Sequence, residues 1–270
     1  MPDMSEYWEV WAPYWSYIED NYLDVSSVRK LIPIISEPVL VIGAGQGLLV
    51  HDLQKHGLEV NGIDAARQMI AAAKERRGLD LYHATGADMP FRDDKYGTAL
   101  VATGVIDFIE DQQQIALILK EAFRVTEDAG KVLIAFYKFH PQTERLLKTL
   151  GFLEDGVWHY KASLKIFRLG TLEFLNVIKE RADVGMLRAL MILLKSQLFL
   201  SKEDRAIITN WRIVWKLAQE ELSSTEPLLK TAPERLPYRD LNQIKGLITD
   251  LGYTVQDVVD LHSCYVVQVS

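Results

Sequence analysis

The feature that most constrains the fold is a short apolar run that ends in three glycines spaced two apart, VLVIGAGQG at residues 39–47. A continuous β-branched run of this kind is typical of a strand buried on both faces of a parallel sheet. Glycine at Gly43, Gly45 and Gly47 permits positive φ angles, so the chain can turn sharply from the strand into a helix. The N–H groups at that helix N-terminus favour an anionic ligand. The segment therefore predicts a strand–turn–helix unit that binds a ligand.

Strand and helix patterns alternate after this turn as far as residue 137. Such alternation predicts a doubly wound, Rossmann-like α/β sheet with right-handed crossovers. Near the end of the chain, two apolar runs are separated only by His262 and Ser263, which is too short for a crossover and requires an antiparallel hairpin. We therefore expect a mostly parallel, seven-stranded sheet that closes with an antiparallel hairpin. The expected strands are residues 39–43, 60–64, 79–84, 98–103, 131–137, 254–261 and 264–270, and the expected helices are residues 46–56, 65–77, 111–125 and 241–251.

Aromatic side chains crowd residues 1–37, ahead of the first strand. Proline suits the first turn of a helix, so we expect a helix to begin at Pro13 and Tyr7 to Trp11 to form a separate short piece. We interpret the segment as a helical cap packed on the core, because rings bury much apolar surface. A flap over a ligand pocket is the alternative interpretation.

Residues 138–239 do not follow the alternation and are interpreted as a helical insertion into a sheet domain made of residues 38–137 plus 240–270. Substrate choice is expected in the insertion, since ligands of open α/β sheets bind beyond the carboxyl ends of the strands. Its segment at 186–200 is apolar almost all round. A buried helix, a homodimer face, a lid over a lipophilic acceptor and a surface that touches membrane are the open interpretations. Further helices are expected at residues 172–180 and 203–222, followed by a linker at 223–238.

Composition argues against several classes of protein. The net charge is −7 and no segment is a dense Lys/Arg cluster, which argues against nucleic-acid partners and a polybasic membrane anchor. Cys264 is the only cysteine, which excludes an internal disulfide and a multi-cysteine metal cluster, and His51 and His56 are too far apart on a helix to share a metal. The most apolar stretch contains Arg188 and Lys195, and the first residues lack a signal-peptide pattern. We expect a cytoplasmic protein without a transmembrane segment or a metal.

Asp64 ends the second expected strand, 21 residues after Gly43. At this distance an acid accepts hydrogen bonds from ribose hydroxyls, so the spacing predicts a cofactor that contains a nucleoside. A dinucleotide would favour G-x-G-x-x-G, whose third glycine is replaced here by Leu48. An NAD(P)-dependent oxidoreductase remains the alternative, although Leu48 and the closing hairpin count against it.

The G-x-G-x-G turn and its strand resemble motif I of the class I S-adenosylmethionine-dependent methyltransferases. Residues 86–111, GADMPFRDDKYGTALVATGVIDFIED, are similar to the adenine-binding and following segments of that family. Residues 121–137, EAFRVTEDAGKVLIAFY, are similar to its next helix, glycine turn and fifth strand, and the closing hairpin is similar to its reversed seventh strand. The likeness is nearest to the branch that contains the ubiquinone and menaquinone biosynthesis methyltransferases.

This resemblance implies S-adenosyl-L-methionine as the cofactor and in-line transfer of its methyl group to a small acceptor, with a lipophilic one left open. It also implies roles for individual residues. They are Gly43, Ala44, Gly45 and Gly47 for the methionine part, Asp64 and Ala65 for the ribose, Met69, Asp88 and the Met89 backbone for adenine, and Thr103 and Gly104 beneath the sulfonium and methyl group.

Catalytic residues are less well defined, because methyl transfer mainly requires alignment and needs a base only when the acceptor must lose a proton. Asp107, Tyr137 and His140 are the candidates near the strand ends. Alternatively, Asp107 caps a turn, and Tyr137 and His140 pack under the insertion. Two departures from the family keep a non-catalytic binding protein as a third hypothesis. Val41 replaces an acid before the first glycine, and Asp107–Phe108 replaces the histidines of many relatives.

Overall fold

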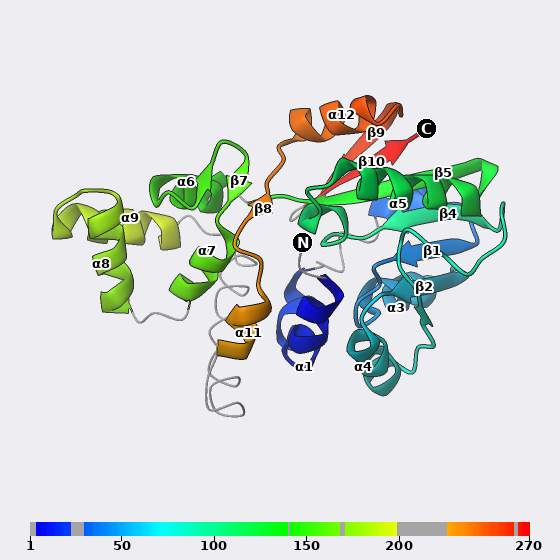
Figure 1. The fold of residues 1–270 in the computed structure, drawn as a ribbon, viewed down its shortest axis with the longest axis horizontal. Coiled ribbons are helices and arrows are strands. Elements are labelled where there is room, and N and C mark those ends of the chain that lie inside the picture. The colour runs from blue at the N-terminus through cyan, green and yellow to red at the C-terminus, as the bar shows by residue number, and fades with distance from the viewer. Residues whose placement is uncertain (1–3, 23–29, 140, 168–170, 199–225, 262–263) are drawn as a thin grey trace. The chain divides into compact units, whose positions relative to one another are not determined.

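A computed structural model describes residues 4–22, 30–139, 141–167, 171–198, 226–261 and 264–270 (Figure 1). The chain divides into two compact units. The sheet unit contains residues 3–138 and 239–270, and the inserted unit contains residues 139–238.

The sheet unit is built on a seven-stranded sheet (Figure 1). In spatial order its strands are β3 (Tyr82–His83), β2 (Val60–Asp64), β1 (Val39–Ile42), β4 (Tyr96–Val101), β5 (Thr126–Tyr137), β10 (Cys264–Val269) and β9 (Val255–Asp260). The first five strands pair in parallel. β10 runs antiparallel to both β5 and β9. The prediction of a mostly parallel Rossmann-like sheet with a closing antiparallel hairpin is confirmed.

Helices cover both faces of this sheet, which explains why β1 is apolar at every position. Leu40 and Ile42 pack on one face with α5 (Gln112–Val125) and α12 (Leu241–Asp250). Val39 and Val41 pack on the other face with α3 (Leu48–Lys55) and α4 (Arg67–Arg77). Successive side chains of a strand point to opposite faces, so a strand between two layers of helices must be apolar throughout.

Short polar signals fix where two of these helices begin. The Asp111 carboxylate accepts a hydrogen bond from the Gln113 N–H at the start of α5 (2.9 Å). Asp240 and Gln243 form a reciprocal capping box at the start of α12. Such caps satisfy N–H groups that lack a partner within the helix. Two 3-10 helices, η1 (Ile32–Ile34) and η2 (Ile106–Phe108), precede β1 and follow β4.

α1 (Met4–Tyr22) is one helix that contains Pro13, so the predicted break at this proline is wrong. Proline in a helix interior costs about 3 kcal/mol, because a backbone hydrogen bond is lost. Packing offsets this cost: Tyr7 and Trp11 are 1% and 0% exposed. The Gln46 side chain also donates a hydrogen bond to the Ala12 carbonyl, directly before the proline (2.6 Å).

The inserted unit contains helices and a small sheet. Its described helices are α6 (Pro141–Thr149), α7 (Tyr160–Phe167), α8 (Thr171–Arg181), α9 (Met186–Leu198) and α11 (Glu226–Thr231). The helices expected at 172–180 and 186–200 are observed as α8 and α9, whereas the one expected at 203–222 lies outside the described residues. An antiparallel sheet, which was not predicted, contains β6 (Leu153–Glu154), β7 (Val157–Trp158) and β8 (Leu236–Pro237). The linker expected at 223–238 was therefore wrong in part, since it contains α11 and β8.

Candidate cofactor-binding site

The glycine turn lies at the carboxyl end of β1, between the ends of β2 and β4. Gly43, Gly45 and Gly47 have φ angles of 75°, 55° and 82°, which other residues rarely adopt. The Gly43 N–H donates to the Ile63 carbonyl (3.0 Å), which fixes the turn to β2. A Cβ atom at Gly43 would lie 2.1 Å from Cγ2 of Val105, in the loop after β4. The turn thus occupies the switch point of the sheet, where such folds bind ligands.

Asp64, the last residue of β2, faces this turn. Its Oδ2 accepts a hydrogen bond from the Gly45 N–H (2.7 Å), and its Oδ1 accepts one from the Ala66 N–H (2.9 Å). Burial raises the pKa of Asp64 above its ordinary value, the two N–H groups lower it, and the nearby Glu9 carboxylate adds to the rise. A carboxylate has about four acceptor positions, so each oxygen retains one after these bonds. The arrangement fits a ligand with two neighbouring hydroxyl groups.

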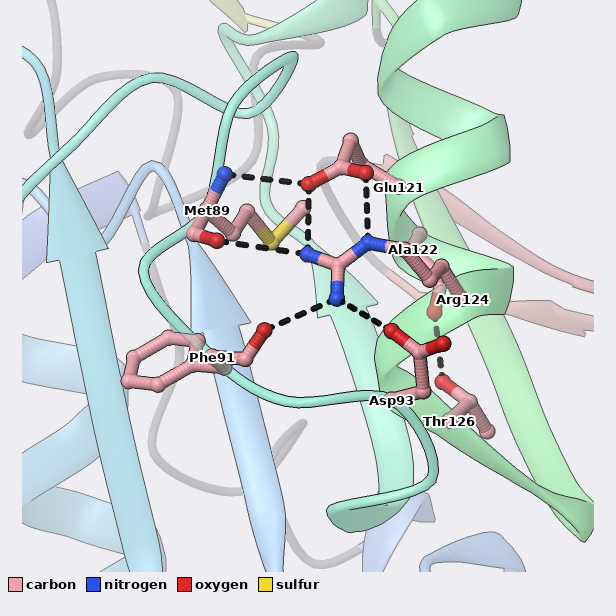
Figure 2. A network of polar contacts seen from close by, with 7 residues as sticks. All are labelled: Met89, Phe91, Asp93, Glu121, Ala122, Arg124 and Thr126. Carbon is pink, nitrogen blue, oxygen red and sulfur yellow. Dashed lines mark hydrogen bonds and ion pairs between the residues drawn. The ribbon is translucent and has the colours of Figure 1, made fainter.

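The loop that carries Asp88 and Met89 is held by a polar network from α5 (Figure 2). The Met89 N–H donates to Oε2 of Glu121 (3.0 Å). The Arg124 guanidinium donates to the carbonyls of Met89 (3.2 Å) and Phe91 (2.8 Å). The Met89 N–H predicted for adenine is therefore already bonded within the protein, and it could reach a ligand only if that bond opened. Asp88 lies on the same loop with an exposed side chain.

Glu121 and Arg124 were missed by the sequence analysis, although their spacing of three on a helix favours an ion pair. Arg124 Nε lies 2.6 Å from Glu121 Oε1, and its Nη1 lies 2.8 Å from Asp93 Oδ1. The hydrogen bond from Arg124 lowers the pKa of Glu121 below its ordinary value, and burial opposes this shift. The pair joins α5 to the loop that follows β3.

Asp107 connects the ends of β4 and β5. Its Oδ2 accepts from the Gly104 N–H (2.8 Å), and its Oδ1 accepts from the Tyr137 N–H (2.9 Å). Burial raises the pKa of Asp107, whereas these N–H groups and the Arg239 guanidinium lower it. Both oxygens are directed to backbone groups, which favours the turn-capping interpretation of this residue over a catalytic one. The catalytic roles of Asp107 and Tyr137 remain predictions.

The other predicted residues that the structure describes lie around the same edge. Ala44 is buried, and its N–H donates to the Ile63 carbonyl (2.8 Å). The Ala65 carbonyl lies 3.0 Å from Nε2 of His83. Thr103 is partly buried and lies two residues after the end of β4. His140, the third catalytic candidate, lies outside the described residues.

The N-terminal helix α1 packs on this edge of the sheet unit. Both carboxylate oxygens of Glu9 accept hydrogen bonds at the start of α4, from the N–H groups of Arg67 (2.6 Å) and Gln68 (2.8 Å). Met69, predicted to contact adenine, is 2% exposed and clusters with Ala12 of α1. The helix thus covers the segment that follows Asp64.

Gln46, inside the glycine turn, joins α1 to α4. Its side-chain amide donates to the Ala12 carbonyl (2.6 Å) and accepts from Nη1 of Arg76 (2.6 Å). Its backbone carbonyl accepts from Nη1 of Arg77 (3.1 Å). The Gln46 residue is 1% exposed, so these bonds replace contacts with water that burial has removed.

The described residues lack two other kinds of feature. No group of three or more His, Cys, Asp or Glu side chains there could hold a metal ion. Across the same ranges, no helix combines the length and the apolar character needed to cross a membrane.

Comparison with known proteins shows which proteins the sheet unit is similar to. Residues 40–134 match the family model for a methyltransferase domain. A demethylmenaquinone methyltransferase of Clavibacter sepedonicus is 25% identical over 126 residues, which cover 45% of this chain and 50% of that protein. The chain thus spans about half the length of this curated relative.

Solved structures agree on the fold. A SAM-dependent methyltransferase of Methanosarcina mazei is 13% identical with a TM-score of 0.52, over 89% of this chain and 95% of that one. The PH0226 protein of Pyrococcus horikoshii OT3 is 15% identical with a TM-score of 0.51, over 91% and 88%. The matched domain and the sheet order together support a class I S-adenosylmethionine-dependent methyltransferase, a family whose cofactor is S-adenosylmethionine.

Proposed function

We propose that this protein is an enzyme that transfers the methyl group of S-adenosylmethionine to a small molecule. The observation that carries the proposal is the contact between Asp64 and the glycine turn. Asp64 accepts from the Gly45 N–H and retains acceptor positions beside the switch point of the sheet. A carboxylate in this place suits the two ribose hydroxyls of the cofactor.

Different residues of the sheet unit bind different parts of the cofactor. The backbone of the glycine turn lies against the methionine part, Asp64 accepts from the ribose, and Asp88 with Met69 lies on the adenine side. S-adenosylmethionine, when bound, supplies a methyl group activated by its positively charged sulfur. The protein then needs mainly to align an acceptor with that methyl group and to exclude water. Asp107 is a positioning residue in this proposal, because it fixes the turn of Gly104 to the end of β5.

The acceptor of this enzyme is small and lipophilic. The inserted unit supports this, because α9 carries exposed apolar side chains, of which Leu187 is 76% exposed. The curated relative is named for demethylmenaquinone, a further argument for a lipophilic acceptor. A screen with methyl-labelled cofactor would compare quinols in detergent with polar amines and acids of similar size. Label transferred only to the polar set would contradict this choice of acceptor.

Calorimetry on the full chain tests the cofactor assignment. The wild-type protein should bind S-adenosylmethionine and S-adenosylhomocysteine but not NAD⁺. Asp64→Ala and Asp64→Asn should weaken the binding of both nucleosides by roughly tenfold or more. A hydrogen bond to a charged group contributes about 1.5–3 kcal/mol, and these variants lose at least one. Asp80→Asn is the matched control, because the Asp80 side chain is exposed and pairs only with Lys74 among the described ion pairs. Binding of NAD⁺ alone, or unchanged affinity in both Asp64 variants, would refute the assignment.

A further inference from the structure

Trp8 of α1 lies across the carboxyl edge of the parallel strands. It packs against the cluster of Ala12, Ala66 and Met69, which lies beyond the end of β2. On its other side, a Cβ atom at Gly104 would lie 3.7 Å from Cζ2 of the Trp8 indole. Trp8 therefore contacts the segments that follow β2 and β4.

These two contacts place the indole between the segments that follow β2 and β4. In the sheet, β1 lies between these two strands, and the glycine turn directly follows it. The indole thus lies beside the segments that flank the proposed cofactor site.

The surroundings of Trp8 hold it in this place. Its ring lies 4.9 Å from Tyr7, 5.1 Å from Trp15 and 5.3 Å from Phe108, measured between centroids. Tyr7 is buried, whereas Trp8 keeps part of its surface exposed. An indole that is fixed by neighbouring rings and still partly open can contact a ligand at little cost in side-chain entropy.

We infer that Trp8 is a specificity-determining residue, whose indole favours the charged sulfonium of S-adenosylmethionine over the neutral thioether of S-adenosylhomocysteine. This inference rests on the proposed function. An indole attracts a cation through the negative potential of its ring face, more strongly than phenylalanine and much more than an aliphatic side chain. Residue Gly104, which lies close to this ring, was predicted to line the place of the sulfonium and methyl group. A protein that binds substrate better than product in this way is less inhibited by its own product.

The test measures dissociation constants by calorimetry for both nucleosides, in the full chain and in three variants. Trp8→Leu should raise the dissociation constant of S-adenosylmethionine by roughly three- to thirtyfold more than that of S-adenosylhomocysteine. Trp8→Phe should keep most of the preference, because an aromatic face remains. Trp15→Leu is the matched control, since Trp15 packs on the same cluster from the same helix and touches Trp8. It should change the ratio of the two constants less than Trp8→Leu does, because it removes only one of the rings that hold the indole.

Three results would overturn the inference. If Trp8→Leu lowered the affinity for both nucleosides equally, the indole would only contribute to packing of the protein. If it raised the affinity for both, the indole would block the site. A change of the ratio in Trp15→Leu as large as in Trp8→Leu would show that the effect is not local to Trp8. A wild-type protein that binds neither nucleoside would instead refute the proposed function and leave the inference without a basis.

Discussion

Replacing Arg124 with methionine should release the loop around Met89 from α5. The guanidinium donates to the carbonyls of Met89 and Phe91, and it pairs with Glu121. The Arg124 side chain is 28% exposed, so the two carbonyl bonds contribute about 2 kcal/mol and the ion pair about 1 kcal/mol. Asp93 adds little, because its side chain is 71% exposed. The expected cost of Arg124→Met is about 3 kcal/mol of local stability.

Hydrogen exchange measured by mass spectrometry reports this cost directly. A loss of about 3 kcal/mol should speed the exchange of the segment 85–91 by roughly a hundredfold, since 1.4 kcal/mol is a factor of ten. Arg92→Met is the matched control, because Arg92 is an exposed arginine of the same loop. It should change the rate by no more than a few-fold. Equal rates in the two variants would refute the idea that Arg124 holds the loop.

Further predictions concern charge, backbone strain and the N-terminal helix. The pKa of Glu121 lies below its ordinary 4.5, so the stabilising effect of the Glu121 carboxylate is complete above about pH 4.5 and is lost as the pH falls through the lowered value. In urea unfolding, the wild-type protein should therefore be more stable than Arg124→Met at higher pH, and this difference should shrink only below about pH 4.5. Gly43→Ala should lower the free energy of unfolding by about 2–4 kcal/mol in the same urea assay, because a Cβ atom there meets a side chain at 2.1 Å and φ is positive. A decrease of less than about 0.5 kcal/mol would contradict this geometry. Glu9→Ala should speed hydrogen exchange at the start of α4 several-fold, since a helix cap contributes about 1 kcal/mol. Glu6→Ala is the control and should leave this exchange unchanged, because the Glu6 side chain is exposed. Equal effects of the two substitutions would show that capping is not the cause.

The sheet could be predicted because its signals are local and strong. The apolar run of β1 requires burial on both faces, and two helical layers provide it. The three residues between β9 and β10 leave room only for a hairpin, which fixes the antiparallel end. The positive φ of Gly43 follows from a turn that admits no side chain. Each of these features is decided by a few residues that are close in sequence.

The failures have physical causes that the sequence does not display. Pro13 lies inside α1 because tertiary packing of buried rings outweighs a local preference. The two-residue strands β6, β7 and β8 are too short to show a period. The Met89 N–H was assigned to a ligand, but Glu121, 32 residues away, accepts it. Long-range partners of a backbone group cannot be found from spacing alone.

The place of β10 in the sheet has a consequence for the order of folding. β10 pairs with β5, although residues 138–263 separate the two strands along the chain. Closing so long a loop is slow and costs entropy, and meanwhile one edge of β5 remains unpaired. The inserted unit shortens that loop when it folds, since the rings of Phe139 and Tyr238, its first and last residues, stack with centroids 4.9 Å apart. A substitution that separates these two rings should therefore delay completion of the sheet without altering either strand.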